Sequence, residues 1–264
     1  MTKAFAAKMA AAVLAMLAVV SFGAPAQAQE SQNRRFDATY AVIIRGIHVG
    51  EFNFHFAQSG DSYEASADRR VTGVWRMAAG DSQDYEYSVR GAVTPEGTLR
   101  PTYYRHQGGK RDRVVESRFS ADDITTTANP PGMSMGHPRA TAAQKRGAID
   151  QLSAIAMMVI AQGEVCDRTL RVYMDGRSRF NFVMRPNGRA AARGRAYSGE
   201  VYRCSVAFEP IAGFSDPQEP ATLEFLFAPT DTGMYAPVRI EMPTDEGMAV
   251  LDARSLNVNG RGIE

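Results

Sequence analysis

The stretch Glu51–Phe56, EFNFHF, decides the fold class of this 264-residue chain. Three phenylalanines alternate with three polar side chains, which is the pattern of a β-strand with one buried face. The apolar run Tyr40–Ile44 precedes this stretch, and Gly46 and Gly50 lie between the two. Glycines at these positions favour a tight turn, so the region predicts a β-hairpin.

The same two-residue period returns along most of the chain. Hairpin turns are predicted at Gly108-Gly109 and at Asp175-Gly176, because glycine tolerates the backbone angles that tight turns need. Further strands are predicted at 63–71, 85–89, 99–106, 113–119, 124–127, 170–174, 180–184, 202–208, 223–227, 237–242 and 248–258. The inward-facing aromatic residues are expected to line the core or a concave apolar face: Phe52, Phe54, Phe56, Phe225 and Phe227.

One segment has a helical period instead. Leu152, Ile155 and Val159 fall at i, i+3 and i+7, and Asp150 is a suitable N-cap. Gly163 is placed where a glycine often ends a helix. The segment is apolar nearly all round, which predicts an enclosed helix. We therefore expect a mainly β fold, in which an antiparallel curled sheet (a β-spiral or unclosed barrel) wraps around one buried α-helix.

The first 28 residues have the pattern of a cleavable signal peptide. Lys3 and Lys8 precede the uncharged apolar run Met9–Val20, and Ala26-Gln27-Ala28 is a small-residue cleavage site. Cleavage is predicted between Ala28 and Gln29. A retained membrane anchor is the alternative, although the run is shorter than the roughly 20 residues that span a bilayer. Export to the periplasm is the expectation.

Four parts of the chain follow from this interpretation: a signal peptide at 1–28, a flexible segment at 29–34, one β-rich domain at 35–258 and a C-terminal tail at 259–264. Residues 128–147 form the longest stretch without a strand or helix pattern. Loops of this length in compact domains are functional or mobile. No later segment is apolar enough to cross a membrane.

The charge balance argues against a nucleic-acid partner. The chain has 30 Lys and Arg against 29 Asp and Glu, for a formal net charge of +1. Removal of residues 1–28 takes away two lysines and no acidic residue, so the mature charge is −1. A protein that grips phosphate backbones needs a strongly basic surface.

Cys166 and Cys204 are the two cysteines of the chain. An even count in an exported protein predicts one disulfide, here between strands on inward faces. Two buried thiols or half of a metal site are the alternatives. No CxxC motif or nearby histidine supports the metal site.

Several strings, taken in order, resemble the DUF3108 family of exported bacterial proteins, in the form seen in alphaproteobacteria. They follow the signal peptide and the first hairpin: Leu99-Arg100-Pro101, Asp150–Ala154, Val172–Gly176, Cys204–Gly213 and Pro237–Ile240. The resemblance implies a periplasmic sheet protein similar to those that curl into a spiral or unclosed barrel. It transfers no catalytic residue. Some similar proteins hold acyl chains in the concave face, which is an analogy of fold.

The sequence contains no nucleophile elbow, P-loop, zinc-protease or dinucleotide-binding motif. His48, His55, His106 and His137 are spread over different elements, and no metal site or cofactor is predicted. The string Met133-x-Met135-x-His137 has ligand types that suit Cu(I), with an ordinary mobile loop as the alternative.

Two basic clusters, 105–113 and 185–195, suit anionic groups, or else are charged hairpin tips. Acidic pairs among Asp61, Asp68, Asp81 and Asp84 leave a glycosidase-like reaction open. No feature singles out one pair.

We therefore expect a non-catalytic periplasmic protein of the cell envelope, with a binding or structural role. An acyl chain or a lipoprotein segment is the candidate ligand of the concave sheet face, and an envelope lipid, lipoprotein or protein is the expected partner. The alternative is an enzyme that hydrolyses envelope polymers with carboxylates that the sequence does not identify. A cleft with converging titratable groups favours the enzyme, and an apolar groove favours the carrier.

Overall fold

A computed structural model describes residues 33–72, 76, 84–109, 111–244 and 246–263. The predicted signal peptide, most of the 29–34 segment and Asp81 lie outside these residues. Within them, no helix has the length and apolar character needed to cross a membrane.

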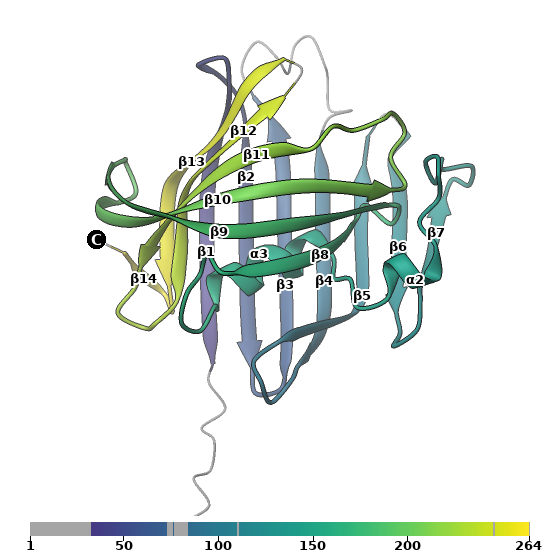
Figure 1. Ribbon diagram of the computed structural model, residues 1–264, viewed down its shortest axis with the longest axis horizontal. Coiled ribbons are helices and arrows are strands. Elements are labelled where there is room, and N and C mark those ends of the chain that lie inside the picture. The colour runs from purple at the N-terminus through teal and green to yellow at the C-terminus, as the bar shows by residue number, and fades with distance from the viewer. Residues whose placement is uncertain (1–32, 73–75, 77–83, 110, 245, 264) are drawn as a thin grey trace, which may run out of the picture. The chain divides into compact units, whose positions relative to one another are not determined.

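The described strands form one antiparallel sheet of 14 strands (Figure 1). Their bounds are β1 Arg34–Ile44, β2 Ile47–Ser59, β3 Ser62–Val71, β4 Tyr85–Val93, β5 Leu99–Gly108, β6 Arg113–Phe119, β7 Ile124–Asn129, β8 Arg168–Met174, β9 Ser178–Arg193, β10 Ser198–Ala212, β11 Ala221–Pro229, β12 Tyr235–Thr244, β13 Gly247–Val258 and β14 Arg261–Gly262. The order is β7-β6-β5-β4-β3-β2-β1-β13-β12-β11-β10-β9-β8, with β14 paired to β13. β7 and β8 do not pair, so the sheet is unclosed, as predicted.

The stretch EFNFHF lies in β2 with the predicted alternation. Phe54 and Phe56 are fully buried, whereas Glu51 and His55 are exposed. In the register of β1 and β2, Phe36 pairs with Phe56. Cross-strand aromatic pairs of this kind fix the register, because a one-residue slip would expose every buried ring.

The predicted helix is α3, Gln151–Val159. Asp150 is its N-cap, and Asp150 Oδ1 accepts hydrogen bonds from the backbone N–H groups of Leu152 (2.9 Å) and Ser153 (3.0 Å). The C-cap is Ile160, so Gly163 lies beyond the end of the helix and the prediction that it ends the helix was wrong. The helix ends without a glycine cap, because the Ile160 backbone N–H donates to the Ala156 carbonyl and closes the final turn.

The chain has a second short helix that the apolar pattern did not predict. α2, Ala142–Lys145, lies within the 128–147 stretch. Thr141 and Gln144 form a capping box at its start, which satisfies two backbone groups of the first turn. Four residues are too few to carry a helical stripe of apolar side chains, so a capping signal was the one available clue.

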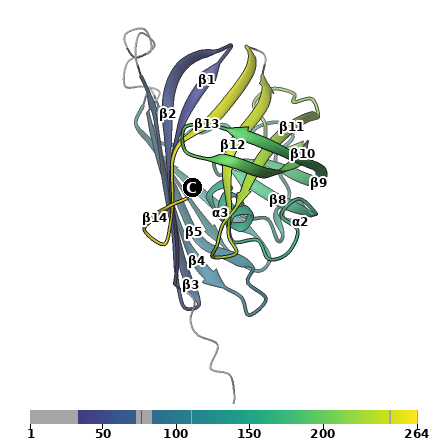
Figure 2. The same cartoon turned by 90° about the vertical axis from the view of Figure 1, so that its left-hand side faces the viewer.

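α3 contacts strands from both halves of the strand order: β3, β4 and β5 from the first half, and β8 and β12 from the second (Figure 2). Its side chains divide between two core clusters. Leu152 and Val159 pack with Phe54 and Phe56, whereas Ala154 and Met158 pack with Phe225. Six of its nine residues are buried (Leu152, Ser153, Ala154, Ala156, Met158 and Val159), in agreement with its lack of a polar stripe.

Cys166 and Cys204 are fully buried and lie at disulfide distance, with their Cα atoms 5.2 Å apart. Cys204 is in β10, but Cys166 lies in the turn before β8. The alternation predicted a disulfide between two strands. This prediction was wrong for Cys166, because only Cys204 lies in a strand. The pair connects the start of the edge strand β8 to β10, past the intervening β9.

Residues at both ends of the predicted domain take part in the sheet. Arg34 begins β1, and residues 259–264, predicted as a tail, include β14. The Asn259 backbone N–H donates to the Arg35 carbonyl at 2.9 Å, and the Arg35 backbone N–H donates to Asn259 Oδ1 at 2.8 Å.

Candidate functional site

A cleft of about 490 Å³ lies where the ends of β3 to β6 meet the turn between β8 and β9. We call it the arginine cleft. Its main polar and aromatic lining residues are Arg69, Arg111, Arg113, Arg177, Asp175, His106, Tyr85 and Tyr87, and Met133 and Ser134 close one side. The lining thus carries four guanidinium groups and one carboxylate.

The turn at Asp175-Gly176 was predicted and is present. Both residues have left-handed backbone angles, with φ of 52° and 70°. A Cβ atom on Gly176 would lie 2.6 Å from Thr126 and 2.9 Å from Val115. Glycine at this position therefore lets the β8–β9 turn pack directly on β6 and β7, and this contact brings Asp175 to the cleft.

Buried polar groups hold the Asp175 carboxylate in place. Gln151 Nε2 donates to Asp175 Oδ1 at 2.8 Å and to the Tyr104 hydroxyl at 2.5 Å. The Tyr104 hydroxyl donates to the same Oδ1 at 3.3 Å. In the described part of the chain, the hydrogen bonds to this carboxylate all reach Oδ1, while its side chain keeps 39% exposure. Asp175 is thus fixed but open to the cleft.

His106 lies beside this carboxylate. Its Nδ1 is 3.9 Å from Asp175 Oδ1 and 3.3 Å from the Tyr104 hydroxyl. Burial lowers the pKa of His106 below its usual range, and the nearby Asp175 offsets only part of this effect. The imidazole is therefore neutral at pH 7 and adds no positive charge to the cleft. Burial also raises the pKa of Tyr104 well above its usual value, which keeps its hydroxyl a donor.

Three arginines of the cleft have no ion-pair partner among the described residues: Arg111, Arg113 and Arg177. Arg177 is held by other oxygen atoms, since its Nη1 donates to Ser215 Oγ at 2.5 Å. The buried Arg113 Nε has no hydrogen-bond partner in the part of the chain that the structure describes. A buried donor without a partner is costly unless a ligand or water accepts its hydrogen bond.

Some arginines elsewhere on the sheet do have a carboxylate partner. Arg185, Arg203 and Arg239 each have a carboxylate oxygen within 3.2 Å. Arg111, Arg113 and Arg177 have no such carboxylate among the described residues, although they line one cleft.

An aromatic wall completes the cleft. The Tyr85 and Tyr87 rings have centroids 6.0 Å apart and planes inclined by 17°, and the Tyr87 and His106 centroids are 5.9 Å apart. The Arg69 guanidinium carbon lies 4.8 Å from the Tyr85 centroid, within cation–π range. A Cβ on Gly109 would lie 2.7 Å from the Tyr85 hydroxyl oxygen, so a glycine here leaves room for the ring.

A family model described as "Protein of unknown function (DUF3108)" matches residues 35–254. The chain belongs to the DUF3108 family. No curated protein matches the sequence. A solved structure titled "Structure of PNGF-II in C2 space group" aligns over 88% of this chain and 28% of its own, with 10% identity and a TM-score of 0.28. A likeness at this level carries no argument for fold or function.

The phenylalanines predicted to line the core or a concave apolar face lie in the core of the DUF3108 domain. Phe54, Phe56, Phe225 and Phe227 are each at most 4% exposed, and Phe52 is partly buried. Asp150 and Leu152 are buried at the start of α3, and Ile155 and Val159 pack in the same core. None of these side chains lines the arginine cleft.

The other candidates from the sequence are dispersed over the DUF3108 domain. Asp68 lies 3.2 Å from Arg70, and Asp84 lies 3.5 Å from Arg76. Met133 lines the cleft, but His137 uses its backbone N–H to bind the Phe214 carbonyl. Among the described residues, no group of three or more His, Cys, Asp or Glu could hold a metal ion.

The two basic clusters have different surroundings. The first supplies Arg111 and Arg113 to the cleft, at the β5–β6 turn. In the second, Arg185 of β9 forms an ion pair with Asp167, which directly precedes β8, and Arg189 of β9 forms one with Glu200 of β10. The first cluster is thus both a hairpin tip and part of a site.

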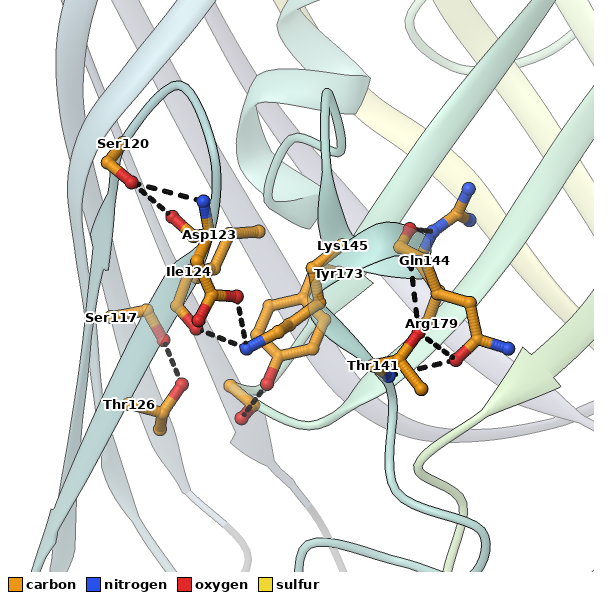
Figure 3. A network of polar contacts seen from close by, with 11 residues as sticks. Ser117, Ser120, Asp123, Ile124, Thr126, Thr141, Gln144, Lys145, Tyr173 and Arg179 are labelled. Atoms are coloured by element: carbon orange, nitrogen blue, oxygen red, sulfur yellow. Dashed lines mark hydrogen bonds and ion pairs between the residues drawn. The ribbon is translucent and has the colours of Figure 1, made fainter.

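A second polar network holds α2 against β7 and β9 (Figure 3). Lys145 Nζ lies 2.6 Å from Asp123 Oδ1 and donates to the Ile124 carbonyl of β7 at 2.6 Å. The buried Arg179 donates from Nε to the Gln144 carbonyl at 2.8 Å, and burial lowers the pKa of Arg179 to about 10. Tyr173 donates to the Gly176 carbonyl at 2.7 Å. This last hydrogen bond closes the β8–β9 turn that carries Asp175.

Sequence reasoning missed Asp175, Gln151 and the tyrosine pair as site residues. Asp175 was interpreted only as a turn residue, and Tyr85 and Tyr87 as one face of a strand. An acidic residue in a predicted tight turn, at a position where asparagine would serve equally well, was the available signal.

Proposed function

We propose that this protein is a non-catalytic, exported component of the cell envelope that binds an anionic group, a phosphate or a carboxylate, in the arginine cleft. The observation that carries the proposal is the convergence of Arg111, Arg113 and Arg177 around one cleft without carboxylate partners in the described chain. The fold in this proposal is a curled sheet that wraps around α3 and leaves the cleft at its rim.

Guanidinium groups suit an anion for two reasons. Each presents a planar set of donors that can bind two oxygens of a phosphate or carboxylate at once. Several like charges in one cleft also repel each other, and an anion removes that repulsion. With neutral His106, the arginines outnumber the single carboxylate Asp175 by four to one.

Export to the periplasm is part of the same proposal, as is the alphaproteobacterial form of the family. Two features support export. Residues 1–28 have the order of charges and apolar residues typical of a signal peptide. The Cys166–Cys204 pair lies at disulfide distance, and disulfides persist in oxidising compartments.

An acyl chain in the concave face has weaker support as the ligand. Such a chain needs an apolar groove, but Phe54, Phe56 and Phe227 pack against other core side chains. The polar lining of the arginine cleft favours a headgroup or another charged group over a hydrocarbon chain.

The first test is titration with inorganic phosphate by isothermal calorimetry, on the wild type and on Arg113→Gln. We expect the substitution to weaken binding about tenfold to a hundredfold, because it removes a charged donor. Arg193→Gln is the matched control, since Arg193 is an exposed arginine on β9, outside the cleft. Equal losses in the two variants would contradict the proposal, and so would the absence of phosphate binding.

A second candidate function, hydrolysis of envelope polymers, is favoured by one observation. Asp175 is a fixed carboxylate with 39% exposure, in a cleft beside His106. The test is release of soluble fragments from purified cell-wall polymer by the wild type and by Asp175→Asn. We expect no release by either protein. Release by the wild type that the variant lacks would establish the hydrolase instead.

A further inference from the structure

We propose that the ligand of the arginine cleft is an anionic sugar, a hexose ring that carries a phosphate or a carboxylate. This inference rests on the proposed function, because it concerns the same cleft. It adds to the anionic group a second part of the ligand, a sugar ring with hydroxyl groups.

The size of the cleft is the first argument. Its volume of about 490 Å³ falls within the roughly 300–1,000 Å³ of sites for small organic molecules. A phosphate ion alone fills a small part of such a volume. The cleft therefore has room for a ligand with a body as well as a charge.

The distribution of side chains is the second argument. Arg111, Arg113 and Arg177 provide charge, whereas ring atoms of Tyr85 and Tyr87 provide apolar surface within the same lining. A sugar ring has C–H groups that pack on such surface and hydroxyl groups that need polar partners. An acyl chain would leave the guanidinium groups without partners, which is costly.

The third argument is the presence of the Asp175 carboxylate. A site that bound only anions would not be expected to contain a negatively charged side chain. A carboxylate repels a phosphate, yet Gln151 and Tyr104 hold this one in place and leave its side chain partly exposed. Its role is explained if it accepts hydrogen bonds from hydroxyl groups. A ligand that carries both an anion and hydroxyl groups satisfies the arginines and Asp175 together.

The experiment is calorimetric titration of the full mature chain at constant ionic strength with inorganic phosphate, glucose 6-phosphate, glucuronate and glucose. Vesicles of phosphatidylglycerol serve as the lipid source of the same anion. We expect glucose 6-phosphate to bind at least tenfold more tightly than inorganic phosphate, and glucuronate more tightly than glucose. This comparison uses the wild type and does not depend on any variant folding.

Asp175→Asn provides the second readout. If Oδ1 keeps its hydrogen bonds from Gln151 and Tyr104, the amide presents an NH₂ donor where the carboxylate presented an acceptor. The substitution removes repulsion from both anions, but it removes the hydroxyl acceptor only from the sugar. We therefore expect the ratio of the two affinities, glucose 6-phosphate over phosphate, to fall at least fivefold. Asp167→Asn, on the exposed Arg185 pair, is the control.

The outcomes separate the two proposals. Equal affinity for phosphate and glucose 6-phosphate overturns the anionic sugar and leaves anion binding intact. Binding to phosphatidylglycerol vesicles without binding to either sugar anion also overturns it, in favour of a lipid headgroup. Failure of every probe overturns both proposals.

Discussion

Loss of the Cys166–Cys204 disulfide is expected to lower the free energy of unfolding by about 4 kcal/mol. The cysteines are 38 residues apart, and closing a loop of that size removes this much conformational entropy from the unfolded chain in the loop-entropy model. For a domain of this size, we expect a fall in melting temperature of about 8–16 °C. The measurement is thermal and urea unfolding of the wild type with and without reductant.

Cys166→Ala/Cys204→Ala is the control for this prediction, since reductant should not change its stability. The loss of stability on reduction should be greatest at the sheet edge, because the disulfide connects the start of β8 to β10. Hydrogen exchange should therefore accelerate more in β8 than in β2. Identical unfolding midpoints for the oxidised and reduced wild type would show that the disulfide contributes nothing.

Asp150→Asn is expected to remove a loss of about 2 kcal/mol in the free energy of unfolding that the wild type undergoes between pH 4 and pH 7. Burial raises the pKa of Asp150 to about 6 in the folded protein, above the usual 3.8, despite hydrogen bonds from Ser153 that lower it. Proton binding by Asp150 therefore stabilises the folded state fully below pH 3.8, and this stabilisation is lost as the pH rises through 6. Asparagine does not ionise, so the variant lacks this loss.

The measurement is urea unfolding of both proteins at several pH values, with the difference in free energy taken at each. That difference should rise in favour of Asp150→Asn as the pH increases. Asp150→Ala is the matched control for the cap itself: it leaves the N–H groups of Leu152 and Ser153 without acceptors and should be about 1–3 kcal/mol less stable than Asp150→Asn at every pH. A difference between wild type and Asp150→Asn that does not vary with pH would refute the prediction.

Much of the sheet could be predicted because its signals are local. The alternation in Glu51–Phe56 fixed which side chains of β2 are buried, and Asp175-Gly176 fixed the place of one turn. The N-cap at Asp150 was equally readable. The end of α3 could not be predicted, because its cap is formed by ordinary backbone hydrogen bonds. The existence of α2 could not be predicted either, because a helix of four residues leaves little trace in an apolar pattern.

The arginine cleft could not be predicted, because its parts are distant in the sequence. Arg113 comes from β6, Tyr87 from β4, and Asp175 from the β8–β9 turn. Each alone has an ordinary explanation as a hairpin tip, a strand face or a turn. The pairing of β4, β5 and β6 brings Tyr87 and Arg113 together, and the close packing of Gly176 against Thr126 and Val115 brings Asp175 to them.

Local sequence patterns were enough to predict the class of fold, the buried face of each main strand and the apolar character of α3, since side-chain direction follows from the backbone period of two or 3.6 residues. The tertiary structure was needed to show that β7 and β8 are the open edges of the predicted unclosed sheet and that Cys166 lies in a turn. It was also needed to show that Arg111, Arg113 and Arg177, which have no carboxylate partner among the described residues, share a cleft with Asp175. These properties depend on packing between segments that are far apart in the chain, and no local period encodes which surfaces will meet.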